Sequence, residues 1–325
     1  MKILFLSDFV PDPKLILNRS FIALLNDADK IVFNLEGSPL TGSDLDNRSQ
    51  IMPINCDELI AFLEAFGKER FVIALANNHI LDNGSVGLEF LIQQLKEYNV
   101  PFFGTKEKPF IIIEEEVVIL NFVTAETVAK YAGKDHLNYL FYNTKQIREQ
   151  IIEIEQLPNK PILYPHWGRD MDTTVFKTYN LGFDKNRWFV FGHHPHVISG
   201  VGDRVIYSMG NTFIPHPYYY KNYPSVRYGL AIMYDSDTET YSKLLTKVIT
   251  SDNYVKNFEL TCEDFEKIPT EVLDNEKHFS SLKRVFLNLF AFDGTLIDFF
   301  RLSALQMISG AFRLKIKYMK KKGYE

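Results

Sequence analysis

The sequence has little cysteine and no long apolar run. Its two cysteines, Cys56 and Cys262, lie far apart in the chain, which argues against a disulfide framework and favours a reducing compartment. No uncharged apolar stretch reaches the roughly 20 residues that a membrane-spanning helix needs. The apolar run Ile3–Leu6 is interrupted by Ser7 and Asp8, so it is too short for the core of a signal peptide. These absences predict a cytoplasmic protein.

The sequence also lacks a large excess of charge of either sign. It has 36 Lys and Arg residues against 41 Asp and Glu residues, which gives a net charge of -5 at pH 7. This balance predicts that nucleic acid is not a general partner. Internal repeats and low-complexity linkers are absent as well. With 325 residues, 46% of them hydrophobic, the chain is long enough for one large domain or for a large domain with an appendage.

Short apolar segments alternate with helical patterns along most of the chain. This alternation is typical of a layered α/β fold. The predicted strands are Ile3–Leu6, Ile31–Asn34, Phe71–Leu75, Val117–Phe122, Ile162–Tyr164, Trp188–Phe191, Val205–Ser208 and Leu230–Tyr234. The predicted helices are Arg19–Leu25, Glu58–Phe66, Val86–Tyr98, Lys145–Glu155 and Thr173–Asn180.

The composition changes near residue 263. Residues 279–319 are dense in Phe and Leu, and Leu302, Leu305, Ile308 and Phe312 recur at helical spacing, which predicts one apolar stripe. We predict a main domain over residues 1–262 and a helical extension over residues 263–325. The extension ends in a basic run, with six Lys and Arg residues between 313 and 322. This run is either the solvated end of a docked helix or a peripheral contact with an anionic membrane surface, at the inner membrane face.

Five predicted strands end in polar side chains that suit metal or proton chemistry. One such end would be explained by a helix cap, because Asn, Asp and Ser commonly begin the following helix. Five are harder to explain in this way, and strand ends in a layered α/β fold converge on one edge of the sheet. Carboxylate oxygens with imidazole nitrogens suit Mn, Fe or Zn. The sequence therefore predicts a metal centre drawn from Asp8, Asn34, Glu36, Asn77, Asn78, His79, Asp82, His166, His193, His194 and His196.

The order of these motifs resembles that of a known family. The stretches SD, NLEG, NNHILDNG, HWG, GHHPH and YSMGN resemble, in this order, the CapA-like proteins of capsule or poly-γ-glutamate synthesis. These proteins are part of the calcineurin-like metallophosphoesterase superfamily. The resemblance extends from the first residue to about residue 235 and implies a four-layer α/β/β/α sandwich with a two-metal site at the strand ends. It also implies a phosphoester substrate, such as a phosphorylated glycan or a lipid-linked intermediate.

The resemblance assigns roles to residues by their positions in these motifs. Asp8 would ligate the first metal, and Glu36 would bridge the two metals. His79 would be the proton donor or a charge stabiliser, oriented by Asp82. The remaining ligands would be Asn78, His166 and His194 on the second metal and His196 on the first. The implied cofactors are two divalent cations, for which Mn, Fe or Zn match the donor chemistry.

Two departures from the superfamily pattern bear on metal binding. Val10 stands where the superfamily has a histidine, which indicates a weakly held first metal or a water in place of this ligand. The bridging carboxylate is Glu36, where the wider superfamily usually has an aspartate.

The sequence leaves open the roles of several polar residues near the candidate ligands. Asn77 is interpreted as a helix cap, and Asp82 either shapes a tight turn or orients His79. Arg169 either pairs with Asp170 or clamps a phosphate oxygen. The other residues expected to support the ligands or contact substrate are Asn34, His193 and Asn211. Of these, His193 is expected to make a hydrogen bond rather than a metal bond, and Asn211 could instead shape a turn.

Two functions are consistent with this pattern. The first is a binuclear metal-dependent phosphoric ester hydrolase that acts in bacterial surface polysaccharide or polymer synthesis. The alternative is a metal-binding assembly component of the same process that does not turn over phosphoesters. The apolar Val10 in the place of a histidine is the feature that favours the alternative.

Overall fold

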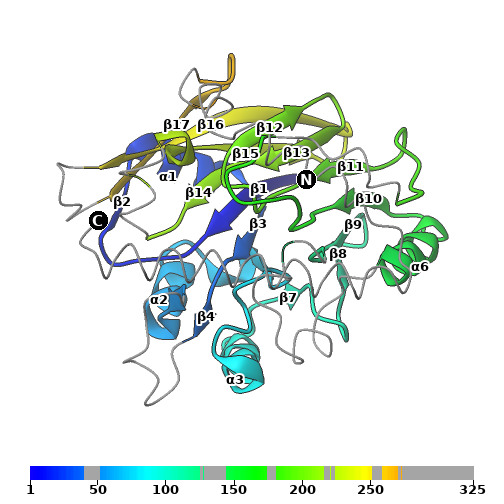
Figure 1. Ribbon diagram of the computed structural model, residues 1–325, viewed down its shortest axis with the longest axis horizontal. Helices are drawn as coiled ribbons and strands as arrows, with labels where there is room; N and C mark the ends of the chain where they lie inside the picture. The colour runs from blue at the N-terminus through cyan, green and yellow to red at the C-terminus, as the bar shows by residue number, and fades with distance from the viewer. Residues whose placement is uncertain are drawn as a thin grey trace, which may run out of the picture.

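Two β-sheets packed face to face form the centre of the protein, and helices cover their outer faces (Figure 1). The computed structural model describes residues 1–39, 52–124, 127, 144–173, 181–215, 220, 224–250, 258–269 and 272. A small additional sheet pairs β4 (Ser38–Pro39) with β5 (Pro53–Ile54).

The larger sheet has nine strands, and its centre is parallel. On the other side of the first strand, the chain returns in antiparallel pairing. The order across the sheet is β2 (Leu15–Leu17), β17 (Phe258–Asp264), β16 (Thr240–Thr250), β15 (Tyr228–Asp235), β1 (Lys2–Phe9), β3 (Lys30–Leu35), β6 (Phe71–Ala74) and β7 (Phe102–Phe103), with β14 (Asn211–Phe213) paired beside β1.

The smaller sheet has six strands, and its four central strands are also parallel. The order across this sheet is β12 (Ile198–Val201), β13 (Val205–Met209), β11 (Phe189–Phe191), β10 (Lys160–Leu163), β9 (Val117–Leu120) and β8 (Phe110–Ile113). In both sheets, the carboxyl ends of the central strands therefore lie at one edge.

Three apolar cores define four layers. Ile3 and Phe5 of β1 pack between the two sheets with Ile162 of β10, while Leu4 of β1 faces the helices on the other side. This alternation arises because successive side chains of a strand point to opposite faces. The larger sheet packs against α1 (Arg19–Asp27), α2 (Cys56–Ala65) and α3 (Gly84–Glu97), and the smaller sheet packs against α6 (Thr144–Glu155). The expected α/β/β/α sandwich is confirmed.

The predicted elements agree well with the structure. Each of the eight predicted strands overlaps an observed strand, and four of the five predicted helices overlap an observed helix. The fifth, Thr173–Asn180, lies outside the described residues except for Thr173. Nine strands of the described residues were not predicted, and the longest of them are β16 and β17, in which buried side chains are mixed with partly or fully exposed ones. Because their exposed faces carry Lys, Thr and Glu, no continuous apolar run marks these strands.

The start of the predicted extension joins the main domain. Strand β17 continues to Asp264, past the expected boundary at residue 262. Phe265, Ile268 and Val272 then pack against the core between the sheets. The predicted apolar stripe and basic run lie outside the described residues. Within the described part of the chain, the helices lack the length and apolar character that a membrane crossing requires.

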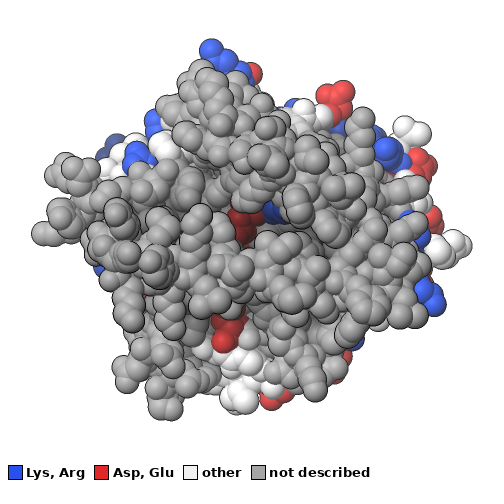
Figure 2. Space-filling view, viewed as in Figure 1, with Lys and Arg blue, Asp and Glu red and all other residues white. Residues whose placement is uncertain are grey.

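Charged side chains of both signs are mixed on the surface. On the face shown in Figure 2, most of the described Lys, Arg, Asp and Glu side chains lie along the outline, and a few of both signs are visible nearer the middle. This distribution fits the small net charge of the chain, -5 at pH 7.

Candidate metal centre

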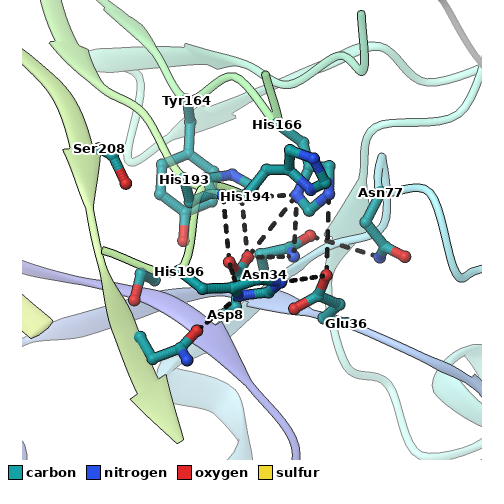
Figure 3. Close-up of polar contacts among 12 residues, drawn as sticks. Asp8, Asn34, Glu36, Asn77, Tyr164, His166, His193, His194, His196 and Ser208 are labelled. Atoms are coloured by element: carbon teal, nitrogen blue, oxygen red, sulfur yellow. Dashed lines mark hydrogen bonds and ion pairs between the residues drawn. The ribbon is translucent and has the colours of Figure 1, made fainter. Parts of the chain in front are cut away.

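Polar side chains from both sheets meet at the edge where the parallel strands end. Asp8 lies near the end of β1, and Glu36 directly follows β3. His166 and His193 follow β10 and β11 of the smaller sheet, and their backbones pair through an isolated β-bridge. Figure 3 shows the two carboxylates and the histidines pointing toward one another. The ends of strands from the two sheets therefore surround one small volume.

Asp8 is fully buried where the register of β1 against β3 shifts. Irregularities of strand pairing, such as β-bulges, re-aim side chains and are common next to active sites. Oδ1 accepts a hydrogen bond from Asn34 Nδ2 at 2.8 Å and lies 3.0 Å from His193 Nδ1, and Oδ2 accepts the backbone N–H of His194 at 3.1 Å. Burial pushes the pKa of Asp8 upward, but the charge of His193 and hydrogen bonds from His166 and His193 outweigh it. The pKa of Asp8 consequently lies well below its ordinary value.

Glu36 has the opposite environment. Its side chain is fully buried, and neither carboxylate oxygen has a hydrogen-bond partner. Oε1 lies 3.8 Å from His166 Nε2 and 3.8 Å from His196 Nε2. Burial raises the pKa of Glu36 well above its ordinary value, and the charges of Asp8 and Asp170 raise it further. A buried carboxylate without partners is costly, and a cation between it and the imidazoles would supply the missing partner.

His166 is fully buried between Asn78 and His193. Its Nε2 lies 2.7 Å from Asn78 Oδ1, and its Nδ1 lies 2.9 Å from His193 Nδ1. Burial lowers the pKa of His166 to about 3. The ring is therefore neutral near pH 7 and keeps a lone pair that a cation could use.

His194 and His196 belong to a strained loop that follows β11. Their φ angles are +96° and +59°, in a region that costs non-glycine residues on the order of 1–3 kcal/mol and that is enriched at functional sites. His196 Nδ1 lies 2.8 Å from Asn211 Oδ1, so its N–H donates to this oxygen and Nε2 is left to face Glu36. Burial lowers the pKa of His194 well below its ordinary value.

Within the described residues, four sets of side chains bring their ligand atoms within 4.8 Å of one another. Two of them match the roles implied by the resemblance, because Glu36 is shared between a first set and a second set. Oxygen and nitrogen donors of this kind fit Mn, Fe or Zn. The four sets are Asp8 with Glu36 and His196; Glu36 with His166 and His194; Asp8 with His166 and His193; and Asp170 with His194 and His196.

His79 lies beside these sets and pairs with Asp82. Its Nδ1 is 2.7 Å from Asp82 Oδ2, and the Asp82 backbone N–H also donates to the His79 carbonyl at 2.9 Å. The Asp82 carboxylate therefore orients the His79 ring, while the Asp82 backbone closes the turn of residues 79–82. The expected helix cap at Asn77 is wrong, because the residue before α3 is Asn83. Asn77 Nδ2 instead donates to the Leu35 carbonyl at 2.8 Å, and its Oδ1 accepts the His79 N–H at 3.0 Å.

Three other residues named from the sequence lie around the centre. Arg169 is outside the four sets, whereas its neighbour Asp170 is a member of one and lies 3.3 Å from His194 Nε2. Sequence reasoning assigned no site role to Asp170, because its position depends on a turn and not on a strand pattern. Val10 is buried and packs in the core on the helix side, so it adds no donor to the set of Asp8.

Two buried side chains behind the centre tie the sheets together. Asn121 Oδ1 accepts the Ala76 N–H at 2.8 Å, and its Nδ2 donates to the Tyr164 carbonyl at 2.7 Å. The Tyr164 hydroxyl donates to the Leu6 carbonyl, and its ring centroid lies 4.4 Å from that of His193. No sequence pattern distinguishes either residue from other residues at strand ends.

Comparisons with known proteins agree with the resemblance. The chain is similar to "Capsule biosynthesis protein CapA" of Bacillus anthracis, with 26% identity over 161 residues. This match covers 43% of the chain and 39% of that protein, so the chain spans well under half the length of this relative.

Two solved structures are also similar. A calcineurin-like phosphoesterase, YfkN from Bacillus subtilis, has 12% identity and a TM-score of 0.39, covering 86% of this chain and 96% of that one. A protein of Thermus thermophilus has 12% identity and a TM-score of 0.40, covering 74% and 97%.

A family model described as "Bacterial capsule synthesis protein PGA_cap" matches residues 12–215. This range holds more than half of the chain, and it contains every candidate ligand except Asp8. The chain belongs to this family of bacterial capsule synthesis proteins.

Proposed function

We propose that the protein is a binuclear metal-dependent phosphoesterase that acts in the synthesis of a bacterial surface polysaccharide or a related polymer. The observation that carries this proposal is Glu36. Its carboxylate is fully buried, has no hydrogen-bond partner, and stands between two imidazole nitrogens at 3.8 Å. Membership of the capsule synthesis family supports the biological setting.

The residues that would hold the cations form two sets around Glu36. Asp8 and His196 complete the first set, and His166, His194 and Asn78 complete the second. When bound, two neighbouring cations position a phosphate group, make water more acidic and neutralise charge on the leaving oxygen. A shared carboxylate suits this arrangement because its two oxygens and negative charge offset the repulsion between the cations.

The chain itself would supply the proton for the leaving group. Asp82 accepts the Nδ1–H of His79 at 2.7 Å, which directs the opposite nitrogen of this ring to proton transfer. A positioned histidine can protonate a departing alkoxide near neutral pH. The Asn77 side chain holds the His79 backbone at 3.0 Å, so the loop that carries Asn78 also fixes the proton donor.

The proposed substrate is a phosphorylated glycan or a lipid-linked intermediate of polymer synthesis. A phosphate held at this edge would be close to the turn that carries Arg169, because the backbone of this turn is bonded to the histidine loop. An arginine at this position is suited to contact a phosphate oxygen.

A second function is favoured by Val10. Its apolar side chain is 2% exposed and packs in the helix-side core, so the first set has three protein donors around one cation. A weakly held first cation would limit hydrolysis, because both cations act on the phosphate. In this alternative the protein binds metal as an assembly component and does not turn over phosphoesters.

The two functions differ in one measurement. Purified protein is analysed for bound metal by elemental analysis and is then assayed with added Mn²⁺ on a panel of phosphomonoesters and phosphodiesters. We expect bound metal together with turnover of at least one ester class. Bound metal without turnover on the whole panel would favour the assembly component, and absence of metal binding would contradict both functions.

A further inference from the structure

A carboxylate outside the proposed ligand set contacts one nitrogen of His194. Asp170 Oδ1 lies 3.3 Å from His194 Nε2, with exposed side-chain fractions of 30% and 3%. The other nitrogen of the same ring, Nδ1, is buried and has no hydrogen-bond partner. A neutral imidazole has one N–H donor and one acceptor nitrogen, and an ionised carboxylate can only accept. A proton on Nε2 would therefore be stabilised by Asp170 and would leave a lone pair on Nδ1.

Two backbone hydrogen bonds hold Asp170 in this place. The Trp167 N–H donates to the His193 carbonyl at 3.1 Å, and the Met171 N–H donates to the Pro195 carbonyl at 2.9 Å. These bonds join the turn after His166 to the histidine loop on either side of His194. The two backbone hydrogen bonds thus hold the segments of Asp170 and His194 side by side, and this brings the two side chains into contact.

Both segments contain non-glycine residues with positive φ angles. His194 and Met171 have φ angles of +96° and +58°. Such angles persist where the surrounding structure imposes them. Gly168 has a φ of +88°, and a Cβ at this position would lie 2.9 Å from Tyr207 Oη and 3.0 Å from Pro195 Cγ. The turn therefore packs closely on the histidine loop and leaves Asp170 little freedom.

We propose that Asp170 is a positioning residue of the metal centre, which accepts the Nε2–H of His194 and so presents Nδ1 to the cation. Histidines that bind metals almost always donate their other N–H to a carboxylate, carbonyl or water, which fixes the tautomer and the ring orientation. Asn211 contacts Nδ1 of His196 at 2.8 Å in the corresponding way. The inference rests on the proposed metal centre and adds to it a residue that neither the motifs nor the resemblance assigns.

The first test compares two substitutions of Asp170 by Mn²⁺ titration calorimetry of the full chain stripped of metal. Asp170→Ala removes the acceptor and is expected to weaken binding by about 10–100-fold, the range for partners of metal ligands. Asp170→Asn keeps an acceptor oxygen in the same place and is expected to bind within a few-fold of the wild type. Asp172→Asn, on the same turn and outside the four sets, is the control and should leave binding unchanged.

An equal and severe loss of Mn²⁺ affinity in Asp170→Asn and Asp170→Ala would overturn the proposal, because it would show that the carboxylate binds the cation directly. Unchanged binding in Asp170→Ala would overturn it as well. The melting temperatures of the metal-free variants show whether each one is folded. Absence of Mn²⁺ binding in the wild type would contradict the proposed function rather than this inference.

The second test reads the tautomer without metal. Long-range ¹H–¹⁵N spectra of protein with ¹⁵N-labelled histidine separate protonated from unprotonated ring nitrogens, and the His194→Ala spectrum assigns the signals. We expect the Nε2–H form of His194 in the wild type and in Asp170→Asn, and loss of this preference in Asp170→Ala. A wild-type ring protonated at Nδ1 alone would overturn the inference even if the protein binds Mn²⁺.

Discussion

The two sheets contribute different chemistry to the same edge of the molecule. The larger sheet supplies the candidate oxygen donors, because Asp8 lies near the end of β1 and Glu36 and Asn78 come after β3 and β6. The smaller sheet supplies nitrogen donors from His166 and from the loop of His194 and His196. One half thus brings negative charge, and the other brings imidazoles, of which those of His166 and His194 have pKa values lowered by burial.

This difference explains why the interface between the sheets matters for the proposed function. Burial raises the pKa of Glu36 well above its ordinary value, and repulsion by the charges of Asp8 and Asp170 raises it further. Imidazoles alone bring no charge to hold two cations. The proposed cation binding would therefore need both halves of the centre and would depend on the packing of the two sheets.

Removing the shared carboxylate should have the largest effect. Glu36→Gln keeps the shape of the side chain but removes the charge and one of the two donor oxygens that would join the sets. We expect Mn²⁺ binding by calorimetry to weaken by more than about 100-fold, beyond the range for residues that only support a ligand. Glu64→Gln, an exposed residue of α2, is the matched control. Wild-type affinity in Glu36→Gln would show that the oxygen half does not need this carboxylate.

The nitrogen donors allow a second comparison, between His193 and its neighbour His194 in the same loop. His194→Ala should remove most bound metal as measured by elemental analysis, because it deletes a proposed ligand. His193→Ala should weaken binding by about 10–100-fold, because His193 contacts Asp8 and His166 without a place in either proposed set. The reverse order of losses would show that the proposed register of the histidine motif is wrong.

Replacing His79 should separate catalysis from metal binding. His79→Ala is expected to slow hydrolysis by roughly 100-fold or more, the scale of general acid–base help, while the metal content stays at the wild-type level. The assay is the phosphoester on which the wild type is most active, and Asp82→Asn should give a smaller loss. Loss of metal in His79→Ala would instead make His79 a ligand.

The smallest expected effect concerns Asn121, whose side chain joins the two sheets by hydrogen bonds. Asn121→Ala leaves the Ala76 N–H and the Tyr164 carbonyl without their partner, and an unsatisfied buried group costs about 1–3 kcal/mol. We expect the free energy of unfolding of the metal-free protein, measured in urea, to fall by roughly 2–4 kcal/mol. Asn159→Ala, which loses one bond to the Glu115 carbonyl at the periphery, should cost less. Equal costs would mean that other contacts hold the sheets together at this edge.

Much of the fold could be predicted because its central strands are buried on both faces. Such strands are nearly continuous apolar runs, such as Phe71–Ala74 and Val117–Leu120. The polar residues directly after these runs identified the edge of the candidate site. Strands outside the parallel centre of the larger sheet, such as β2 and β16, have a partly exposed face, so their sequence pattern is weaker.

The sequence by itself determined the central strands and the candidate donor residues, because these depend on local periodicity and on residues adjacent to each strand end. The four layers were implied by the resemblance. Only the tertiary structure decided how the donors are used. Asp8 and His193 are 185 residues apart in the chain, yet their side chains lie at 3.0 Å. The orientation of each imidazole, the lack of partners at Glu36 and the contact of Asp170 with His194 all arise where distant segments pack together. No local pattern encodes such contacts, because each one depends on the position of both segments at once.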